Sequence, residues 1–263
     1  MKDYIKRFLK KSDFFIFLLT KVRKTFRSLN SQSNESEILE KLLKWHPSIP
    51  KNFIEFGFGA WEFNCIKLAQ EEHWEGLLID GNNYQVRMSN FIFHNKIKAI
   101  KYWLTLENLN PIVDFAKNKK IGILSVDIDG NDFWFLRKLV KLKPALIIAE
   151  YNSSFGLKMI SVPYDPNFDR TKNSSSNLYY GASITAISFL LEKNNYSLIE
   201  ISSLGNNLFF LRNDLLNPSD IPLSAANCFR EQFISKHTRH LDHFEIMKDQ
   251  DFIEINEENL MDT

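Results

Sequence analysis

The sequence predicts an α/β fold with a mostly parallel sheet, and three observations carry that prediction. Short aliphatic runs alternate along the chain with segments whose apolar residues recur every three or four positions. Several of the runs end on acidic residues, which places carboxylates at the carboxyl edge of a parallel sheet. The last two runs are joined by a connection of hairpin length, so we expect the sheet to end in an antiparallel hairpin.

The elements of the main domain, 37–228, follow in chain order. We expect strands at 52–56, 76–80, 97–104, 121–126 and 145–149, then the hairpin strands 196–201 and 207–211. We expect helices at 38–45, from the first glycine loop to about 73, and at 84–93, 109–117, 133–140 and 183–193. Pro47 ends the first helix, Phe133, Leu136 and Leu139 show the helical spacing, and Gly205 lies in the hairpin connection. Residues 229–263 should add a helix and an acidic tail.

The composition limits the class of protein that the chain can be. The 263 residues suit one full-sized domain with appendages, and 44% hydrophobic with 25% charged residues is ordinary for a globular protein. A net charge of +1 argues against a nucleic-acid binder that relies on bulk positive charge. Cys65 and Cys228 lie far apart without a CxxC pair, which indicates a reducing compartment and no thiolate metal site. We therefore expect a cytoplasmic protein.

Residues 1–36 form a basic N-terminal segment and hinge. Residues 1–33 carry nine Lys or Arg against two Asp, a net charge of +7. The apolar run 14–19 is too short to span a bilayer, and no signal-peptide cleavage pattern follows it. Two interpretations stay open: a helix that packs its apolar side chains on the domain, or a helix in peripheral contact with an anionic membrane surface.

Two neighbouring strands should deliver polar side chains to one rim. The strand 121–126 runs into Asp127 and Asp129, and the strand 145–149 runs into Glu150 and Asn152. Because ligands bind outside the carboxyl ends of parallel strands, this rim is the expected site of chemistry. The irregular stretch 153–180 that follows is typical of a lid or substrate loop, and its alternative is a disordered surface excursion.

The first strand turns into a glycine loop that is typical of nucleotide-type cofactor sites. Gly57 and Gly59 let backbone approach a ligand, and Asp80, 21 residues after Gly59, can accept hydrogen bonds from ribose hydroxyls. These features fit NAD as well as S-adenosylmethionine. Glu55 suits an ammonium group better than a pyrophosphate, and Glu62 stands where a dinucleotide motif has its third glycine. The loop therefore favours S-adenosylmethionine.

The run 124–134, LSVDIDGNDFW, resembles the motif of FkbM-like S-adenosylmethionine-dependent methyltransferases, and 150–152 and 179–183 are similar to segments of their relatives. The resemblance covers roughly 52–211. It implies the Rossmann-like class I methyltransferase fold: a mostly parallel seven-stranded sheet with an antiparallel last strand and helices on both faces. It also implies O-methylation of sugars, polyketides or other small hydroxylated molecules, with many relatives in glycan biosynthesis. Trp61 departs from the glycine common at its position in methyltransferases.

By the same resemblance, residues of this chain receive expected roles. The cofactor-binding set is Glu55, Gly57, Gly59, Asn64, Asp80, Gly81 and Asp127, with Glu55 and the two loop glycines at the methionine end and Asp80 on the ribose. The expected acceptor-binding residues are Asn152 and Tyr180. The partner is a small-molecule or glycan acceptor, without nucleic acid.

Methyl transfer to a hydroxyl needs a group that removes its proton. Asp127, Asp129 and Glu150 are the catalytic candidates, because clustered carboxylates raise one another's pKa and one of them becomes a usable base. The same three could instead hold Mg²⁺, which prefers oxygen ligands and would acidify the hydroxyl. The structural alternative is that Asp127 or Asp132 caps the following helix, and for Asp132 we favour it.

Other candidates are assigned structural roles. His237, His240 and His243 recur every three residues, but on a helix they do not converge on one ion, so we expect a solvated helix face. Trp103 and Trp134 are expected in the core.

The sequence thus predicts an S-adenosylmethionine-dependent O-methyltransferase whose carbohydrate or similar hydroxylated acceptor binds beneath the 153–180 loop. One alternative is an NAD(P)-dependent oxidoreductase, which predicts an apolar residue at Glu55 and a glycine at Glu62. The other is a catalytically inactive domain of the same fold, for which Trp61 in the glycine loop is the main argument.

Overall fold

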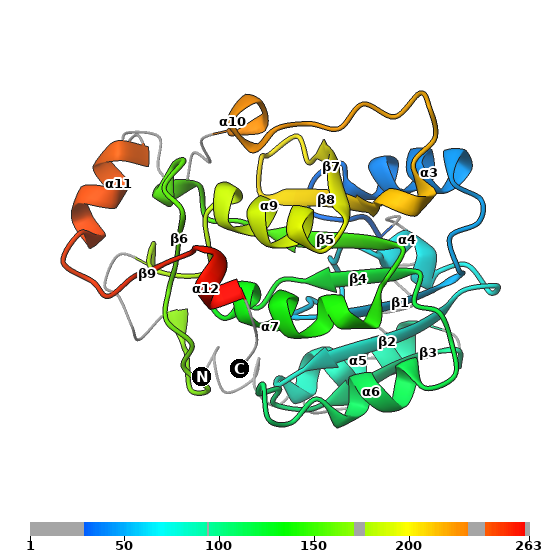
Figure 1. Cartoon of the computed structure of the whole chain (residues 1–263). Helices are drawn as coiled ribbons and strands as arrows, with labels where there is room; N and C mark the ends of the chain where they lie inside the picture. The colour runs from blue at the N-terminus through cyan, green and yellow to red at the C-terminus, as the bar shows by residue number, and fades with distance from the viewer. Residues whose placement is uncertain (1–28, 94, 171–176, 231–239, 261–263) are drawn as a thin grey trace, which may run out of the picture.

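The computed structural model describes residues 29–93, 95–170, 177–230 and 240–260, and its centre is a seven-stranded sheet of order β3-β2-β1-β4-β5-β8-β7 (Figure 1). The strands are β1 (Asn52–Phe56), β2 (Glu75–Asp80), β3 (Ile97–Lys101), β4 (Ile123–Val126), β5 (Leu146–Glu150), β7 (Tyr196–Ile201) and β8 (Asn207–Arg212). Neighbours from β3 to β5 pair in parallel, whereas β8 is antiparallel to both β5 and β7. The predicted class I methyltransferase fold is confirmed.

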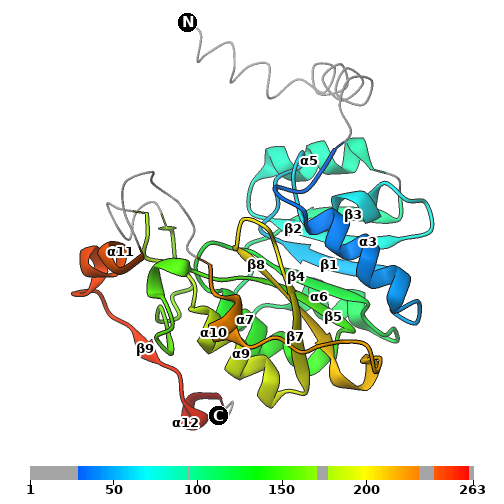
Figure 2. The ribbon, with the colours of Figure 1, turned by 90° about the horizontal axis from the view of Figure 1, so that it is seen from above.

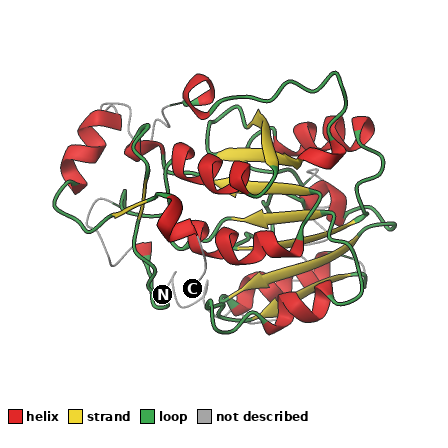
Figure 3. Cartoon of the chain, viewed as in Figure 1, coloured by secondary structure: helices red, strands yellow, loops and turns green. Residues whose placement is uncertain are grey.

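Helices cover both faces of this sheet, as Figures 2 and 3 show. The helices α6 (Asn110–Ala116), α7 (Asp132–Leu139) and α9 (Ile184–Lys193) pack into one buried cluster with the apolar residues of one face. The other face packs against α3 (Glu35–Trp45), α4 (Ile66–Ala69) and α5 (Asn83–Ile92). The strands β1, β4 and β5 are buried almost throughout because both of their faces are covered, which explains why apolar residues predominate in them without a polar alternation.

Two elements are shorter than expected. The third strand ends at Lys101 instead of Leu104. Tyr102 N–H still donates to the Asp80 carbonyl, and the chain then turns between Thr105 and Asn108. The helix after the glycine loop comprises only α4, whereas we expected it to run to about residue 73. The shorter β3 leaves more irregular chain at the carboxyl edge of the sheet, and the early end of α4 leaves more at the amino edge, before β2.

The C-terminal region folds back on the domain. A two-stranded sheet pairs β6 (Ile160–Ser161) with β9 (Ile253–Glu254), so the end of the chain is tied to the predicted lid region. The helix α12 (Glu257–Leu260) follows, and Arg137 of α7 donates to the Asn259 carbonyl at 2.6 Å. The helix expected from residue 229 is instead α10 (Ala225–Cys228) and α11 (His240–Met247), with 231–239 outside the described residues.

Residues 1–28 of the basic segment 1–36 also lie outside the described residues, so the two interpretations of that segment remain predictions. In the described part of the chain, no helix is long and apolar enough to cross a bilayer.

Candidate functional site

A cavity of about 680 Å³ opens at the carboxyl ends of β1, β2 and β4. Its volume lies within the range of small-molecule sites. Its lining includes the glycine loop, the end of β2 and the start of the DIDGND segment; the residues are Phe56–Gly59, Ile79–Asn82, Gln85, Tyr102–Leu104, Asp127–Asp129, Asn131, Phe135, Pro166 and Phe168. Four predicted cofactor residues, Gly57, Gly59, Asp80 and Gly81, thus meet Asp127 at one cavity.

The glycine loop lies directly against the start of the DIDGND segment. Gly57 has φ +77°, and a Cβ added there would lie 1.5 Å from the carbonyl oxygen of Asp127. No side chain fits in that space, and positive φ is a conformation that only glycine adopts freely. Gly57 therefore brings the ends of β1 and β4 together and keeps the backbone open to the cavity.

Glu55 does not face the cavity. Its side chain is buried beneath the loop, where Oε1 accepts the N–H of Asn64 at 2.8 Å and Oε2 accepts the N–H of Cys65 at 2.9 Å. Burial raises the pKa of Glu55 to about 7, although these hydrogen bonds act in the opposite direction. In this geometry Glu55 holds the chain before α4 in place, and its expected contact with the methionine end of the cofactor stays a prediction.

Asn64 lies behind the cavity as well. It is buried, and its amide donates to Ser125 Oγ at 3.0 Å while its carbonyl accepts from Asn207 at 3.3 Å. These contacts link the loop to β4 and β8. Asn64 thus supports the loop from behind and does not line the cavity.

Asp80 ends β2 at the cavity wall. Its Oδ1 accepts the N–H of Asn82 at 2.6 Å, and partial burial raises its pKa. The next residue, Gly81, lies against the indole of Trp103, since an added Cβ would be 3.0 Å from Trp103 Cε3. Trp103 is 61% exposed, so the prediction that it belongs to the core was wrong. The prediction for Trp134, which is buried on α7, is confirmed.

Asp127 and Glu150 form a pair of acidic side chains at the ends of β4 and β5. Burial, followed by the charges of neighbouring carboxylates, raises the pKa of both well above the ordinary range, and the charge of Asp127 contributes to the raised pKa of Glu150. Asp127 lines the cavity and Glu150 stands behind it. Glu150 Oε2 is buried and has no hydrogen-bond partner among the described residues. Such a pair can hold a proton between its members.

Asp129 is held differently from Asp127 and Glu150. It adopts φ +55°, which is uncommon for a residue with a side chain, and its carboxylate is 57% exposed at the cavity. The Arg170 guanidinium pairs with this carboxylate and lies 3.6 Å from the centroid of the Tyr180 ring. The structure therefore separates Asp129 from the buried Asp127–Glu150 pair.

The two expected acceptor residues are both buried. Asn152 donates to the carbonyls of Leu178 at 2.6 Å and Tyr180 at 2.8 Å, and its own oxygen accepts from Ser154 N–H. Tyr180 is 2% exposed, with its ring beneath Arg170. Asn152 therefore links the end of β5 to the returning chain at 178–180, and its expected role at the acceptor stays a prediction.

Asp132 has the structural role that we favoured, by another geometry. Its two carboxylate oxygens accept the N–H groups of Ile128 at 2.8 Å and Gly130 at 2.9 Å. It thus closes the turn that carries Asp129 instead of capping α7, whose N-cap is Asn131. The turn geometry of the DIDGND segment therefore depends on its last acid.

The metal hypothesis gains no support from this arrangement. Within the described residues, no three or more His, Cys, Asp or Glu side chains are grouped so that they could hold a metal ion. His243 is buried, with Nδ1 3.4 Å from Ser154 Oγ, so a solvated helix face was the wrong expectation for this residue. His237 lies outside the described residues.

Trp61 packs against the core on the α3–α5 face and is absent from the described cavity lining. The turn from Gly59 to Glu62 is closed by a hydrogen bond of 2.9 Å from Glu62 N–H to the Gly59 carbonyl. A large side chain at position 61 therefore leaves the cavity open, and the main argument for an inactive domain loses force.

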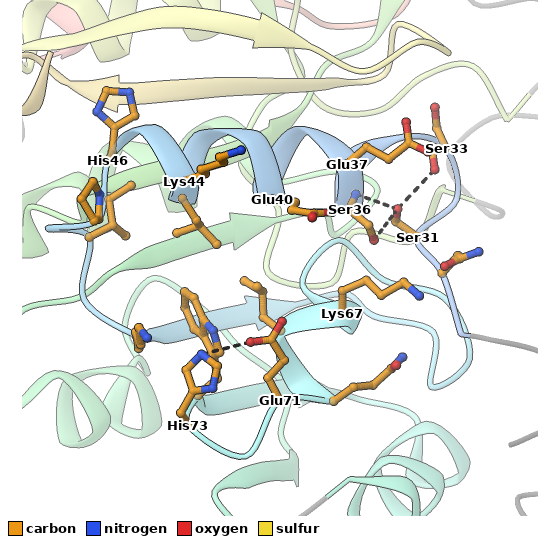
Figure 4. A pocket seen from close by; sticks show the side chains of 18 residues that line it. Ser31, Ser33, Ser36, Glu37, Glu40, Lys44, His46, Lys67, Glu71 and His73 are labelled. Carbon is orange, nitrogen blue, oxygen red and sulfur yellow. Dashed lines mark hydrogen bonds and ion pairs between the residues drawn. The ribbon is translucent and has the colours of Figure 1, made fainter. Parts of the chain in front are cut away.

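A second hollow of about 870 Å³ lies between α3, the residues before β1 and α4 (Figure 4). Its side chains are mixed in charge, and Glu71 and His73 pair across 3.0 Å. It lies toward the amino ends of the strands, because Lys51 and Trp74, which precede β1 and β2, line it. The cavity at the carboxyl ends is thus the one that parallel-sheet topology favours.

Sequence reasoning missed Trp103, Pro166 and Phe168 as part of the cavity wall. Trp103 had a usable signal, since it follows the third strand at the same edge as the acidic residues. Pro166 and Phe168 reach the wall through a long-range return of the chain that periodicity does not reveal.

No protein-family model and no curated protein matches the chain. Among solved structures, an O-methyltransferase from Bacillus cereus in complex with SAH is similar at 13% identity and a TM-score of 0.46, covering 80% of this chain and 96% of that one. The N-terminal domain of EvdMO1 with SAH bound is similar at 14% identity and a TM-score of 0.42, covering 69% and 80%. A likeness at this level concerns architecture alone.

Proposed function

We propose that the chain is an S-adenosylmethionine-dependent O-methyltransferase acting on a small hydroxylated acceptor. The observation that carries the proposal is the convergence of Gly57, Gly59 and Asp80 with Asp127 on one cavity of about 680 Å³. The loop offers close backbone approach, β2 offers a carboxylate for ribose hydroxyls, and β4 offers an acid at the reacting end. The FkbM-like resemblance of residues 124–134 supports the same conclusion.

The cofactor supplies a methyl group on a sulfonium, which is electrophilic without further activation. What the protein adds is binding, orientation and a destination for the acceptor's proton. Asp80 and the Gly57–Gly59 backbone would hold the cofactor, with Gly81 and Trp103 beside Asp80. Asp127 would accept the proton, because it lines the cavity and its raised pKa makes its ionised form a stronger base. Glu150 would share that proton from behind.

Asp129 and Tyr180 would act on the acceptor side. Asp129 presents an exposed carboxylate next to Asp127, and carboxylates are good partners for sugar hydroxyls. Its pairing with Arg170 balances its charge, which suits a neutral acceptor such as a carbohydrate. The segment 153–180 would cover the acceptor. We place the reaction in the cytoplasm, in glycan or secondary-metabolite biosynthesis, with peripheral membrane contact through the basic N-terminal segment 1–36 as part of the proposal.

The decisive experiment is calorimetric titration of the purified chain with S-adenosylhomocysteine and, separately, with NAD. We expect binding of S-adenosylhomocysteine alone, weakened roughly tenfold to a hundredfold in Asp80→Ala, since hydrogen bonds to charged groups contribute about 1.5–3 kcal/mol. Asp114→Ala is the matched control, because this aspartate is exposed on α6 and absent from the described lining of the cavity. Binding of NAD alone would overturn the proposal in favour of an oxidoreductase. Binding of neither would favour an inactive domain.

Turnover separates binding from chemistry. Asp127→Asn should retain S-adenosylhomocysteine binding and lose methyl transfer to a sugar panel by about a hundredfold or more, the usual range for a general base. The same panel with EDTA and with added Mg²⁺ tests the metal hypothesis. Full activity of Asp127→Asn would remove Asp127 from the proposed chemistry.

A further inference from the structure

The segment 163–170, named here the strap, is fixed on one side by the loop after β4. The Asn131 amide donates to the Asp165 carbonyl at 2.8 Å, and Asp165 N–H donates to Asn131 Oδ1 at 3.2 Å. Phe168 lies against Gly130 so closely that an added Cβ would be 2.2 Å from Phe168 Cδ1. One end of the strap is therefore attached to the segment that carries the acidic residues.

The other side of the strap is fixed by the loop after β3. Trp103 Nε1 donates to the Pro166 carbonyl at 2.9 Å, and Leu106 N–H donates to Tyr164 Oη at 2.9 Å. In the sheet, β2 and β1 lie between β3 and β4. The strap thus joins two loops across the very strand ends that carry Asp80 and the glycine loop.

Trp103 takes part in both the cavity and the strap. Its ring lies against Gly81 and lines the cavity together with Pro166 and Phe168 of the strap. Its N–H is committed to the strap although 61% of the residue is exposed. A ligand in the cavity would cover the exposed part of this ring. It would thereby strengthen the hydrogen bond from Trp103 Nε1 to the Pro166 carbonyl, because hydrogen bonds gain strength when water is excluded.

We propose that Trp103 is a positioning residue that latches the strap across the cofactor cavity, so that cavity occupancy and strap closure stabilise each other. The inference rests on the proposed function for the identity of the ligand, S-adenosylmethionine, but not for the latch itself. Because such coupling is reciprocal, a closed strap tightens cofactor binding by the same factor. The acceptor then meets a strap already closed on the cofactor, which predicts ordered binding with the cofactor first.

Hydrogen exchange of the full chain tests the latch without any ligand. Trp103→Phe keeps an aromatic ring and removes only the N–H donor. In the free protein we expect the amides of Asp165 and Phe168, which donate within the strap and to Asn131, to exchange roughly threefold to tenfold faster, the effect of one net hydrogen bond on local opening. Trp45→Phe is the matched control, since Trp45 is 50% exposed at the end of α3. Unchanged exchange in free Trp103→Phe overturns the latch.

Exchange with saturating S-adenosylhomocysteine tests the coupling. We expect the ligand to slow exchange of the strap amides in wild type and to slow it by a several-fold smaller factor in Trp103→Phe, with calorimetric affinity reduced by that same factor. Equal protection in both proteins overturns the coupling. If wild type binds no S-adenosylhomocysteine, the proposed function fails, and the free-protein comparison still decides whether Trp103 latches the strap.

Discussion

Replacing Glu55 with glutamine should change how stability depends on pH, because Glu55 is a buried acid without a cationic partner in its described contacts. Its oxygens accept the N–H groups of Asn64 and Cys65, and the residue is 1% exposed. Burial raises its pKa from an ordinary 4.5 to about 7. The folded protein therefore holds this proton more tightly than the unfolded chain does.

The direction follows from linkage between protonation and folding. Below pH 4.5 both states are protonated and the contribution of Glu55 to stability is fully present. As pH rises through about 7, the unfolded chain has released its proton and the folded one must follow, so that contribution is lost. A shift from 4.5 to about 7 corresponds to about 3 kcal/mol of unfolding free energy. Glu55→Gln has no proton to release there and lacks this loss.

Urea unfolding of both proteins at several pH values measures the effect. The wild-type profile alone is not diagnostic, because the pKa values of Asp80, Asp127, Asp132 and Glu150 are also raised. The unfolding free energy of wild type minus that of Glu55→Gln isolates the contribution of Glu55. This difference should fall by about 3 kcal/mol between about pH 4 and about pH 8.

A control and a contrary result define the test. The control is Glu40→Gln, at an exposed glutamate on α3, for which the difference in unfolding free energy from wild type should not change with pH. A difference that stays flat or rises with pH for Glu55→Gln would refute the reasoning. It would mean that the two backbone donors outweigh burial and that Glu55 is ionised in the folded protein.

Three further substitutions probe the site. Gly57→Ala places its Cβ 1.5 Å from backbone at φ +77°, so we expect a loss of about 3 kcal/mol or more and little folded protein by circular dichroism; near-normal melting would contradict the geometry. Gly130→Ala brings its Cβ to 2.2 Å from Cδ1 of the Phe168 ring, a side chain that can move, so the protein should stay folded while strap amides exchange faster; unfolding would show that the ring cannot move. Asn152→Ala leaves two buried carbonyls without this donor and should cost about 2–5 kcal/mol in urea unfolding; a cost below about 1 kcal/mol would mean that water replaces the amide.

The fold was accessible from the sequence because its signals are local. The run from Ile123 to Val126 is mostly aliphatic and does not alternate with polar residues, and a strand of that kind needs helices on both faces, which limits the architecture to a covered parallel sheet. Ser183 at the start of α9 accepts from Ala186 N–H at 3.1 Å, the cap that a helix start at that residue requires. The antiparallel β8 followed from the short connection after Ile201, which cannot support a parallel crossover.

Features that depend on distant chain were not accessible. Trp103 was assigned to the core because an aromatic run after Lys101 extends a strand pattern, whereas the chain turns there and leaves the ring at the cavity. His243 is buried because α11 packs near Ser154, some ninety residues earlier in the chain. The pairing of β6 with β9 has the same origin, since two-residue strands carry no periodic signal.

The candidate site shows where sequence reasoning about polar residues stops. Position along a strand fixes the edge at which a side chain lies, but not whether its polar atoms face a ligand or the backbone. Glu55 and Asn152 end up with their side chains bonded to N–H and carbonyl groups, whereas Asp80 and Asp127 line the cavity. Buried backbone groups near irregular turns must find partners, and a carboxylate or amide beside them meets that need. An acid at a strand end is therefore as much a candidate support for the loop as a candidate ligand group, and comparing Glu55→Gln with Asp80→Ala in ligand binding separates the two roles.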